Sequence, residues 1–121
     1  MPPKITIKKD YIKIEPKEVD FGEICEVIIE IRNSPELSEK IGIWVFHEGP
    51  IKLDYVDLYK LKDFIREICP KNGTKRKTAI VVNSGIQSAM ALLFSQIAVD
   101  LPFEIKVFFD FQAAVDWITN K

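Results

Sequence analysis

Residues 77–90 read KTAIVVNSGIQSAM, and this stretch decides the fold. The run from Ala79 to Val82 is unbroken apolar and rich in β-branched residues, which is typical of a strand covered on both faces. Ser84 follows, with Gln87 three residues later, and a hydroxyl at this position suits the start of a helix. A buried strand that leads through a short polar loop into a helix is the repeating unit of parallel α/β proteins.

Other strands are predicted on both sides of this stretch. Residues 41–46 form a second unbroken apolar run, whereas residues 103–109 alternate, as expected of a strand at or near a sheet edge. Residues 5–7 and 11–14 also alternate, and the connection between them is short enough for a hairpin. Strands that alternate with helices of this length indicate a largely parallel sheet.

The starts of the other helices are marked by acidic residues. Asp20 with Glu23 fits a capping box, and the helix that follows ends before Pro35. Asp54 and Asp110 are the caps of two later helices. The sequence therefore predicts an α/β fold with a mixed, mostly parallel five-stranded sheet and four helices, in the order β-β-α-β-α-β-α-β-α.

Length and composition set the class of protein. The 121 residues suit a single domain, 1–121, and a composition of 47% hydrophobic and 29% charged residues is that of a globular protein. The net charge of −1 provides no long-range field for nucleic acid. No apolar run reaches the roughly 20 residues of a membrane span. Two cysteines without a CxxC pair predict reduced thiols and a cytoplasmic location.

In this order of elements the chain resembles the STAS domains, named for sulphate transporters and anti-sigma factor antagonists. The resemblance is carried by residues 77–90, by residues 107–118 (VFFDFQAAVDWI) and, more weakly, by the helix of residues 22–35 that leads to the Trp44 strand. The C-terminal half is more specifically similar to bacterial proteins described as STAS-like or CRAL-TRIO-like. These are packing motifs, so the resemblance implies a fold and says little about chemistry.

The resemblance has one clear departure. Anti-sigma antagonists carry a phosphorylatable Asp-Ser-x-Gly at the start of the second helix, where residues 47–54 of this chain read HEGPIKLD. No Ser or Thr lies between Ser38 and Thr74, so the phosphoserine switch of that family is not implied at this position.

Candidate site residues lie where the loops after parallel strands meet on one rim. They are His47, Asn83, Ser84, Gly85 and Asp110. The loop 83–85 opens a helix whose free N–H groups suit a phosphate or a carboxylate, and its alternative interpretation is a plain helix cap. No catalytic residue, metal site or cofactor is predicted, because the chain has no nucleophile elbow, no glycine-rich phosphate loop and a single histidine.

Surface contact is expected at Leu101, Phe103 and Phe111, because apolar and aromatic side chains anchor interfaces. The helix that begins at Ser84 is apolar nearly all round, which suits the centre of the helical layer, the wall of an apolar cavity or a dimer surface. The basic residues of the loop 71–77 are interpreted as a solvated turn.

These observations favour a non-catalytic regulatory or protein-interaction domain that forms a homodimer. Self-association or a protein partner is expected, with no nucleic acid and no membrane span. The alternative function is the binding of a small apolar or anionic ligand, and an enzyme of unknown class comes third.

Overall fold

The central element of the fold is a five-stranded sheet, seen in a computed structural model that describes residues 3–69 and 76–119. Its strand order is β1-β2-β4-β6-β7, with bounds Lys4–Ile7, Tyr11–Glu15, Ile41–Val45, Arg76–Val81 and Phe103–Phe108. β1 pairs antiparallel with β2, and the other three pairs are parallel. The predicted hairpin and the mostly parallel mixed sheet are therefore confirmed.

The character of β4, β6 and β7 agrees with their place in the sheet, whereas β2 alternates although it is an interior strand between β1 and β4. The two unbroken apolar runs form the interior strands β4 and β6, where Ile43 and Ala79 are fully buried. The alternating run 103–109 forms β7 at one edge of the sheet, and β1 forms the other edge. Strand positions covered on both faces need apolar residues, so these runs could be recognised in the sequence, although β6 begins with the polar residues Arg76, Lys77 and Thr78.

Five helices lie within the described residues, with bounds α1 Phe21–Arg32, α2 Pro35–Ser38, α3 Tyr55–Ile68, α4 Gly85–Ile97 and α5 Phe111–Thr119. Four of these correspond to the predicted helices, and α2 is additional. Pro35 starts α2 instead of only ending the helix before it, because proline fits the first turn and Ser34 caps it by accepting from the backbone N–H of Leu37. A small second sheet, β3 (Val19–Asp20) beside β5 (Ile51–Lys52), was also not predicted.

Three of the four predicted helix caps are present. The side chains of Asp54, Ser84 and Asp110 each accept a hydrogen bond from a backbone N–H in the first turn of their helix. The capping box predicted at Asp20 is wrong, because the Asp20 side chain makes no capping hydrogen bond. The Glu23 carboxylate turns instead to the preceding loop, where it accepts from the backbone N–H groups of residues 17 and 18.

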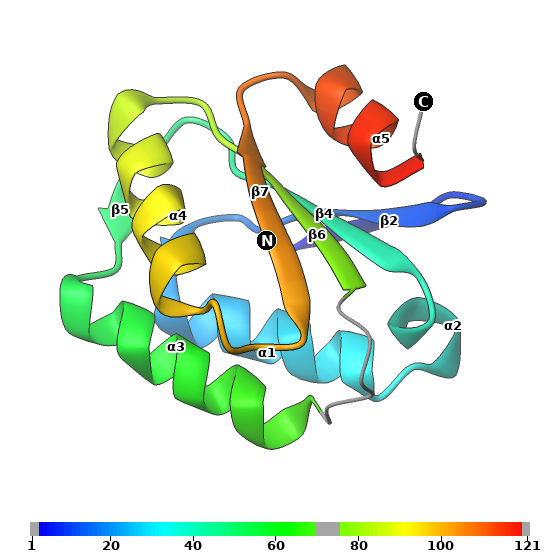
Figure 1. Cartoon of the computed structure of the whole chain (residues 1–121), viewed down its shortest axis with the longest axis horizontal. Coiled ribbons are helices and arrows are strands. Elements are labelled where there is room, and N and C mark those ends of the chain that lie inside the picture. Colours follow the sequence, from blue (N-terminus) through cyan, green and yellow to red (C-terminus); the bar gives the residue numbers. More distant parts are fainter. Residues whose placement is uncertain (1–2, 70–75, 120–121) are drawn as a thin grey trace.

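The helices cover the sheet unequally (Figure 1). α1, α3 and α4 pack on one side, here called the three-helix face, where the short helix α2 lies beside α1, and α5 packs alone on the other, here called the α5 face. The core of the three-helix face includes Ile24, Leu58, Leu61, Phe94, Ala98 and Leu101. The core of the α5 face consists of Ile43, Val45, Ala79, Val81, Ala114 and Ile118. The strand residues alternate between the two cores: Trp44 and Ile105 pack against the first, and Ile43, Val45, Ala79 and Val81 belong to the second.

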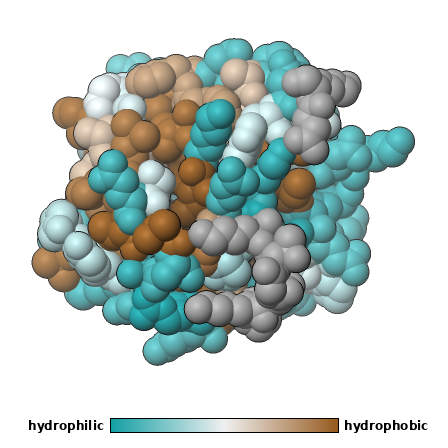
Figure 2. Space-filling view, in the orientation of Figure 1, coloured by the Kyte–Doolittle hydropathy of each residue, from teal (hydrophilic) through white to brown (hydrophobic). Residues whose placement is uncertain are grey.

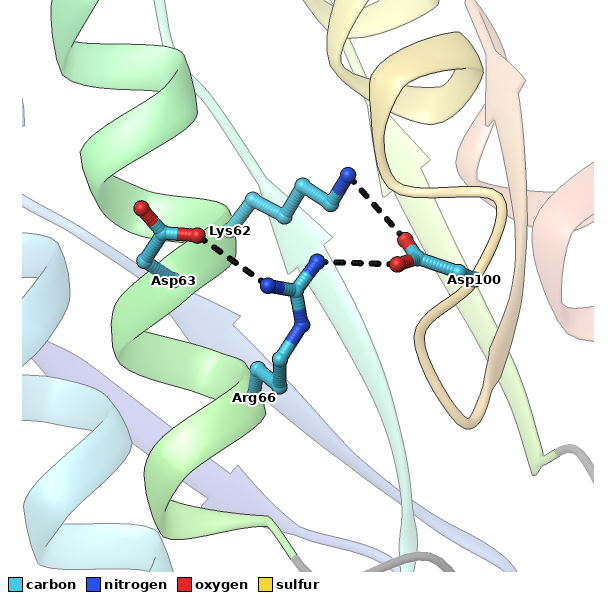
Figure 3. A network of polar contacts seen from close by, with 4 residues as sticks. All are labelled: Lys62, Asp63, Arg66 and Asp100. Atoms are coloured by element: carbon cyan, nitrogen blue, oxygen red, sulfur yellow. Dashed lines mark hydrogen bonds and ion pairs between the residues drawn. The ribbon is translucent and has the colours of Figure 1, made fainter.

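An ion-pair network, the Asp100 latch, joins α3 to the turn after α4 (Figure 3). The Asp100 carboxylate lies 3.2 Å from Lys62 Nζ and 2.8 Å from a guanidinium nitrogen of Arg66, which also contacts Asp63 at 3.4 Å. The hydrogen bond from Lys62 is the main reason that the pKa of Asp100 lies below its ordinary value. The latch holds the turn in which the next residue, Leu101, enters the core.

Candidate ligand-binding site

A cavity of about 200 Å³ lies within the three-helix face. Its wall is mainly apolar, formed on the sheet side by residues such as Ile14, Trp44 and Ile105, and on the helix side by residues such as Ile28, Leu61 and Phe94. Protein interiors are packed as densely as organic crystals, and voids larger than a water molecule are few. A void of this size in a small domain therefore requires a specific cause.

Small side chains are among those that line the cavity where the helices approach the sheet. Ala91 of α4, Thr78 of β6 and Cys69 after α3 all line the cavity, and each is smaller than the Leu or Ile that would fill the space. Trp44 and Phe46 stack with their ring centroids 6.4 Å apart and form part of the sheet-side wall.

Gln87 stands at one end of the cavity and is the one buried polar side chain in the described part of the chain, at 4% exposure. Its Oε1 accepts from the backbone N–H of Asn83 at 2.7 Å, and its Nε2 donates to the backbone carbonyl of His47 at 2.9 Å. The side chain thus ties the ends of β4 and β6 together. Both Oε1 and Nε2 of Gln87 have hydrogen-bond partners, so Gln87 leaves no unpaired polar atom at this end of the cavity.

The other end of the cavity is lined by Arg32, Ser38, Cys69 and Arg76. The Arg76 guanidinium donates to the backbone carbonyls of Ser38 and Glu39 at 2.7 and 2.8 Å. Burial raises the pKa of the Cys69 thiol and outweighs the opposing effect of the two arginines. The thiol is therefore neutral near pH 7 and poorly suited to nucleophilic chemistry. No buried side-chain polar atom of the described residues lacks a hydrogen-bond partner.

The predicted rim residue His47 follows β4 and pairs with a residue that the sequence reasoning missed. His47 Nε2 lies 2.7 Å from Oε2 of Glu15, the last residue of β2. Burial raises the pKa of Glu15, but the hydrogen bond with His47 and the charge of Lys13 outweigh it, so the pKa lies below its ordinary value. The pair arises because β2 and β4 are neighbours in the sheet, which the chain order alone does not state.

Two of the other rim residues, Ser84 and Asp110, act as helix caps in the structure. Ser84 Oγ accepts from the backbone N–H of Gln87, and the N–H of Asn83 is already bound to the Gln87 side chain, so two amides near Gly85 are occupied. Asp110 Oδ2 accepts from the backbone N–H of Ala113 at 3.1 Å. Within the described structure neither Ser84 nor Asp110 hydrogen-bonds with His47. These contacts favour the plain-cap interpretation of the loop 83–85.

The three predicted interface residues make packing contacts within the molecule. Leu101 is 1% exposed within the core of the three-helix face, so the prediction that it forms a surface contact is wrong. The turn after α4, closed by a hydrogen bond from Leu101 N to Ala98 O, directs its side chain inward. Phe103 packs against the same core, and the Phe111 ring meets Tyr11 edge-on at 6.2 Å. Neither Phe103 nor Phe111 is fully exposed.

Exposed apolar side chains lie at several places, among them α4 and the end of β7 (Figure 2), and also the start of α3, where Tyr55 and Val56 are exposed. Figure 2 shows hydrophobic side chains gathered over α4 and reaching the edge strand β7, with hydrophilic ones between them. Ile86 is 71% exposed, and Leu92, Val99 and Phe109 are also exposed. The signal was present in the sequence, because α4 has no charged residue on any face.

Comparisons with known proteins identify no relative: no protein-family model, curated protein or solved structure matches the chain. No helix among residues 3–69 and 76–119 is long and apolar enough to cross a membrane. Most of the predicted basic loop, including Lys71 and Lys75, lies outside the described residues. Of its other members, Arg76 donates to the carbonyls of Ser38 and Glu39 at the end of α2, and Lys77 Nζ donates to the carbonyl of Trp117 at 2.9 Å.

Proposed function

We propose that this domain binds a small apolar ligand in the cavity of the three-helix face. The observation that carries the proposal is the cavity of about 200 Å³ with its apolar wall. The pocket is neither fully enclosed nor flat, and its wall is mainly apolar, so a ligand that displaces water from it gains the free energy of apolar burial. A ligand that fills the space recovers the dispersion contacts that the wall lacks.

The size and lining of the cavity define the class of ligand. An apolar cavity of about 150 Å³ accommodates benzene, so this cavity suits an aromatic or aliphatic group of about eight carbon atoms. The buried polar groups at its ends, such as Gln87, already have partners. An uncharged, largely hydrocarbon ligand is therefore favoured over the anionic ligand that the sequence also allowed.

The first measurement is the native mass of the purified protein, repeated after denaturation. A non-covalent excess that disappears on denaturation is the expected result if the protein retains its ligand. If the cavity is emptied during purification, toluene and indole serve as probes. Either probe at about 100 times its Kd is expected to raise the melting temperature on the order of 10 °C.

Two leucine variants on α4 form a matched pair for this test. Ala91→Leu fills the cavity and is expected to abolish the probe shift while stabilising the free protein by about 1 kcal/mol. Ala89→Leu adds the same side chain on the exposed face of the helix and leaves the probe shift unchanged. A native mass without excess, together with no response to either probe in the unsubstituted protein, contradicts the proposal.

A second candidate function is regulatory protein interaction in a STAS-like domain. The order of the strands and of the four long helices supports a STAS-like arrangement, with α2, β3 and β5 as additions to the predicted order. The exposed apolar side chains of the charge-free helix α4 support an interaction surface. In this proposal the rim pair His47–Glu15 has no catalytic role.

A further inference from the structure

The edge strand β7 has a free side that the ligand proposal does not use. Val82 N donates to Phe108 O at 2.8 Å and Arg76 N donates to Pro102 O at 3.1 Å, so the even-numbered residues of β7 direct their backbone groups toward β6. Backbone groups alternate in direction along a strand, so those of Phe103, Ile105 and Val107 point away from the sheet. In the described part of the chain no other strand pairs with them.

The two edges of the sheet differ in how they are protected. At the β1 edge, Lys4 and Lys8 are exposed, and repeated lysine is a common guard against edge-to-edge pairing. On β7 the exposed charged residues are Glu104 and Lys106, which have opposite signs. Glu104 forms no ion pair with any described residue. The β7 edge therefore carries charges that complement a reversed copy of itself.

We propose that β7 pairs antiparallel with β7 of a second copy, about a two-fold axis at Ile105. In this register Ile105 faces its own copy, the outward backbone groups of Phe103 meet those of Val107, and Glu104 of each chain faces Lys106 of the other. Moving the register by one hydrogen-bonding step places Glu104 opposite Glu104, or Lys106 opposite Lys106. Like charges directly opposite each other destabilise a strand pair, so the charges select the central register.

The surface beside β7 supports the same partner. α4 packs against β7 on the three-helix face, carries no charge and exposes Ile86 and Leu92. A two-fold axis at Ile105 places both copies of α4 on the same side of the joined sheet, flanking the axis. Apolar contact between them adds to the strand hydrogen bonds, which by themselves bury little area.

The test is a charge-reversal series on the full chain, with the dimer dissociation constant measured by sedimentation. The unsubstituted protein is expected to dimerise. Glu104→Lys creates two like-charged pairs per dimer and is expected to weaken the dimer about tenfold. Adding Lys106→Glu to the same chain exchanges the two signs and is expected to restore the dimer, because each pair is again of opposite charge. Glu67→Lys on the exposed side of α3 is the control for net charge.

Folding is checked separately, because Lys106 Nζ also lies 5.8 Å from the ring centroid of Trp117, and replacing Lys106 removes this contact within the chain. Each variant is unfolded in urea at a concentration at which it is monomeric, and only variants with an unchanged midpoint are compared. A protein that is monomeric at every concentration overturns the proposal. So does a dimer that ignores Glu104→Lys but is weakened by Leu92→Lys, since that result places the contact on α4 alone. Neither outcome depends on whether the cavity binds a ligand.

Discussion

The two faces of the sheet are packed to different densities. On the α5 face a single helix covers the strands closely, and both Ala79 and Ala114 are fully buried where helix and sheet meet. On the three-helix face, three helices cover the same sheet and leave a cavity of about 200 Å³. The number of covering helices therefore does not decide how well a face is filled. What decides it is the match between side-chain volumes and the space left by the helix positions.

The borders of the two faces also differ. Around α5, lysine ammonium groups lie over aromatic rings: Lys13 is 4.7 Å from the centroid of Phe111, and Lys77 is 5.1 Å from that of Trp117. The lysine stems extend over apolar surface while their charges reach solvent. On the three-helix face the corresponding contact is the Asp100 latch, an ion-pair network between α3 and the turn after α4 (Figure 3). Lysine–aromatic contacts therefore border the α5 face, whereas ion pairs border the three-helix face at one margin.

The largest expected effect comes from truncating one buried isoleucine on each face. Ile118→Ala on α5 removes a side chain with partners all round and is expected to cost about 3 kcal/mol of unfolding free energy. Ile24→Ala on α1 removes an equally buried side chain that already borders the cavity, and is expected to cost about 1 kcal/mol less. Urea unfolding measures both. Equal losses would mean that the two faces are packed alike.

Substitutions that enlarge a side chain are expected to have an intermediate effect and to distinguish the packing of the two faces. Ala114→Leu forces a larger side chain into the closed contact between α5 and the sheet, and is expected to destabilise the protein by about 2 kcal/mol. Ala91→Leu adds the same atoms beside the cavity and is expected to be neutral or stabilising. Thermal unfolding of the two variants against the parent protein provides the measurement. A loss at Ala91 as large as that at Ala114 would remove the distinction.

The smallest expected effect is a pH dependence from Glu15, on the α5 side of the sheet. Its pKa in the folded state lies below the ordinary value of 4.5, so the folded state binds this proton less readily than the unfolded state. The stabilising contribution is therefore complete above the unfolded pKa and is lost as the pH falls through the folded pKa. Glu15→Gln is expected to reduce the loss of stability between neutral and acidic pH. Urea midpoints measured from neutral to acidic pH test this prediction. A Glu15→Gln variant that loses as much stability at acidic pH as the unsubstituted protein would contradict it.

Local signals predicted much of the fold but less of the site. Periodicity distinguished the interior strands β4 and β6 from the edge strand β7, and short-range capping marked the starts of α3, α4 and α5. At the candidate site, the sequence placed His47 at the rim without its partner Glu15, and it assigned Leu101 to the surface. The His47–Glu15 pair depends on which strands are neighbours in the sheet, and the burial of Leu101 depends on the direction of the turn after α4.

The sequence by itself determined the order, type and starts of most elements, because hydrogen bonds within a turn and the alternation of apolar residues act over a few neighbouring positions. Only the tertiary structure decided the cavity beside Ala91, the Glu15–His47 pair and the redirection of Glu23 away from a capping box. Those features depend on volumes and distances between segments remote in the chain, and no local pattern encodes the space that remains when three helices meet one sheet.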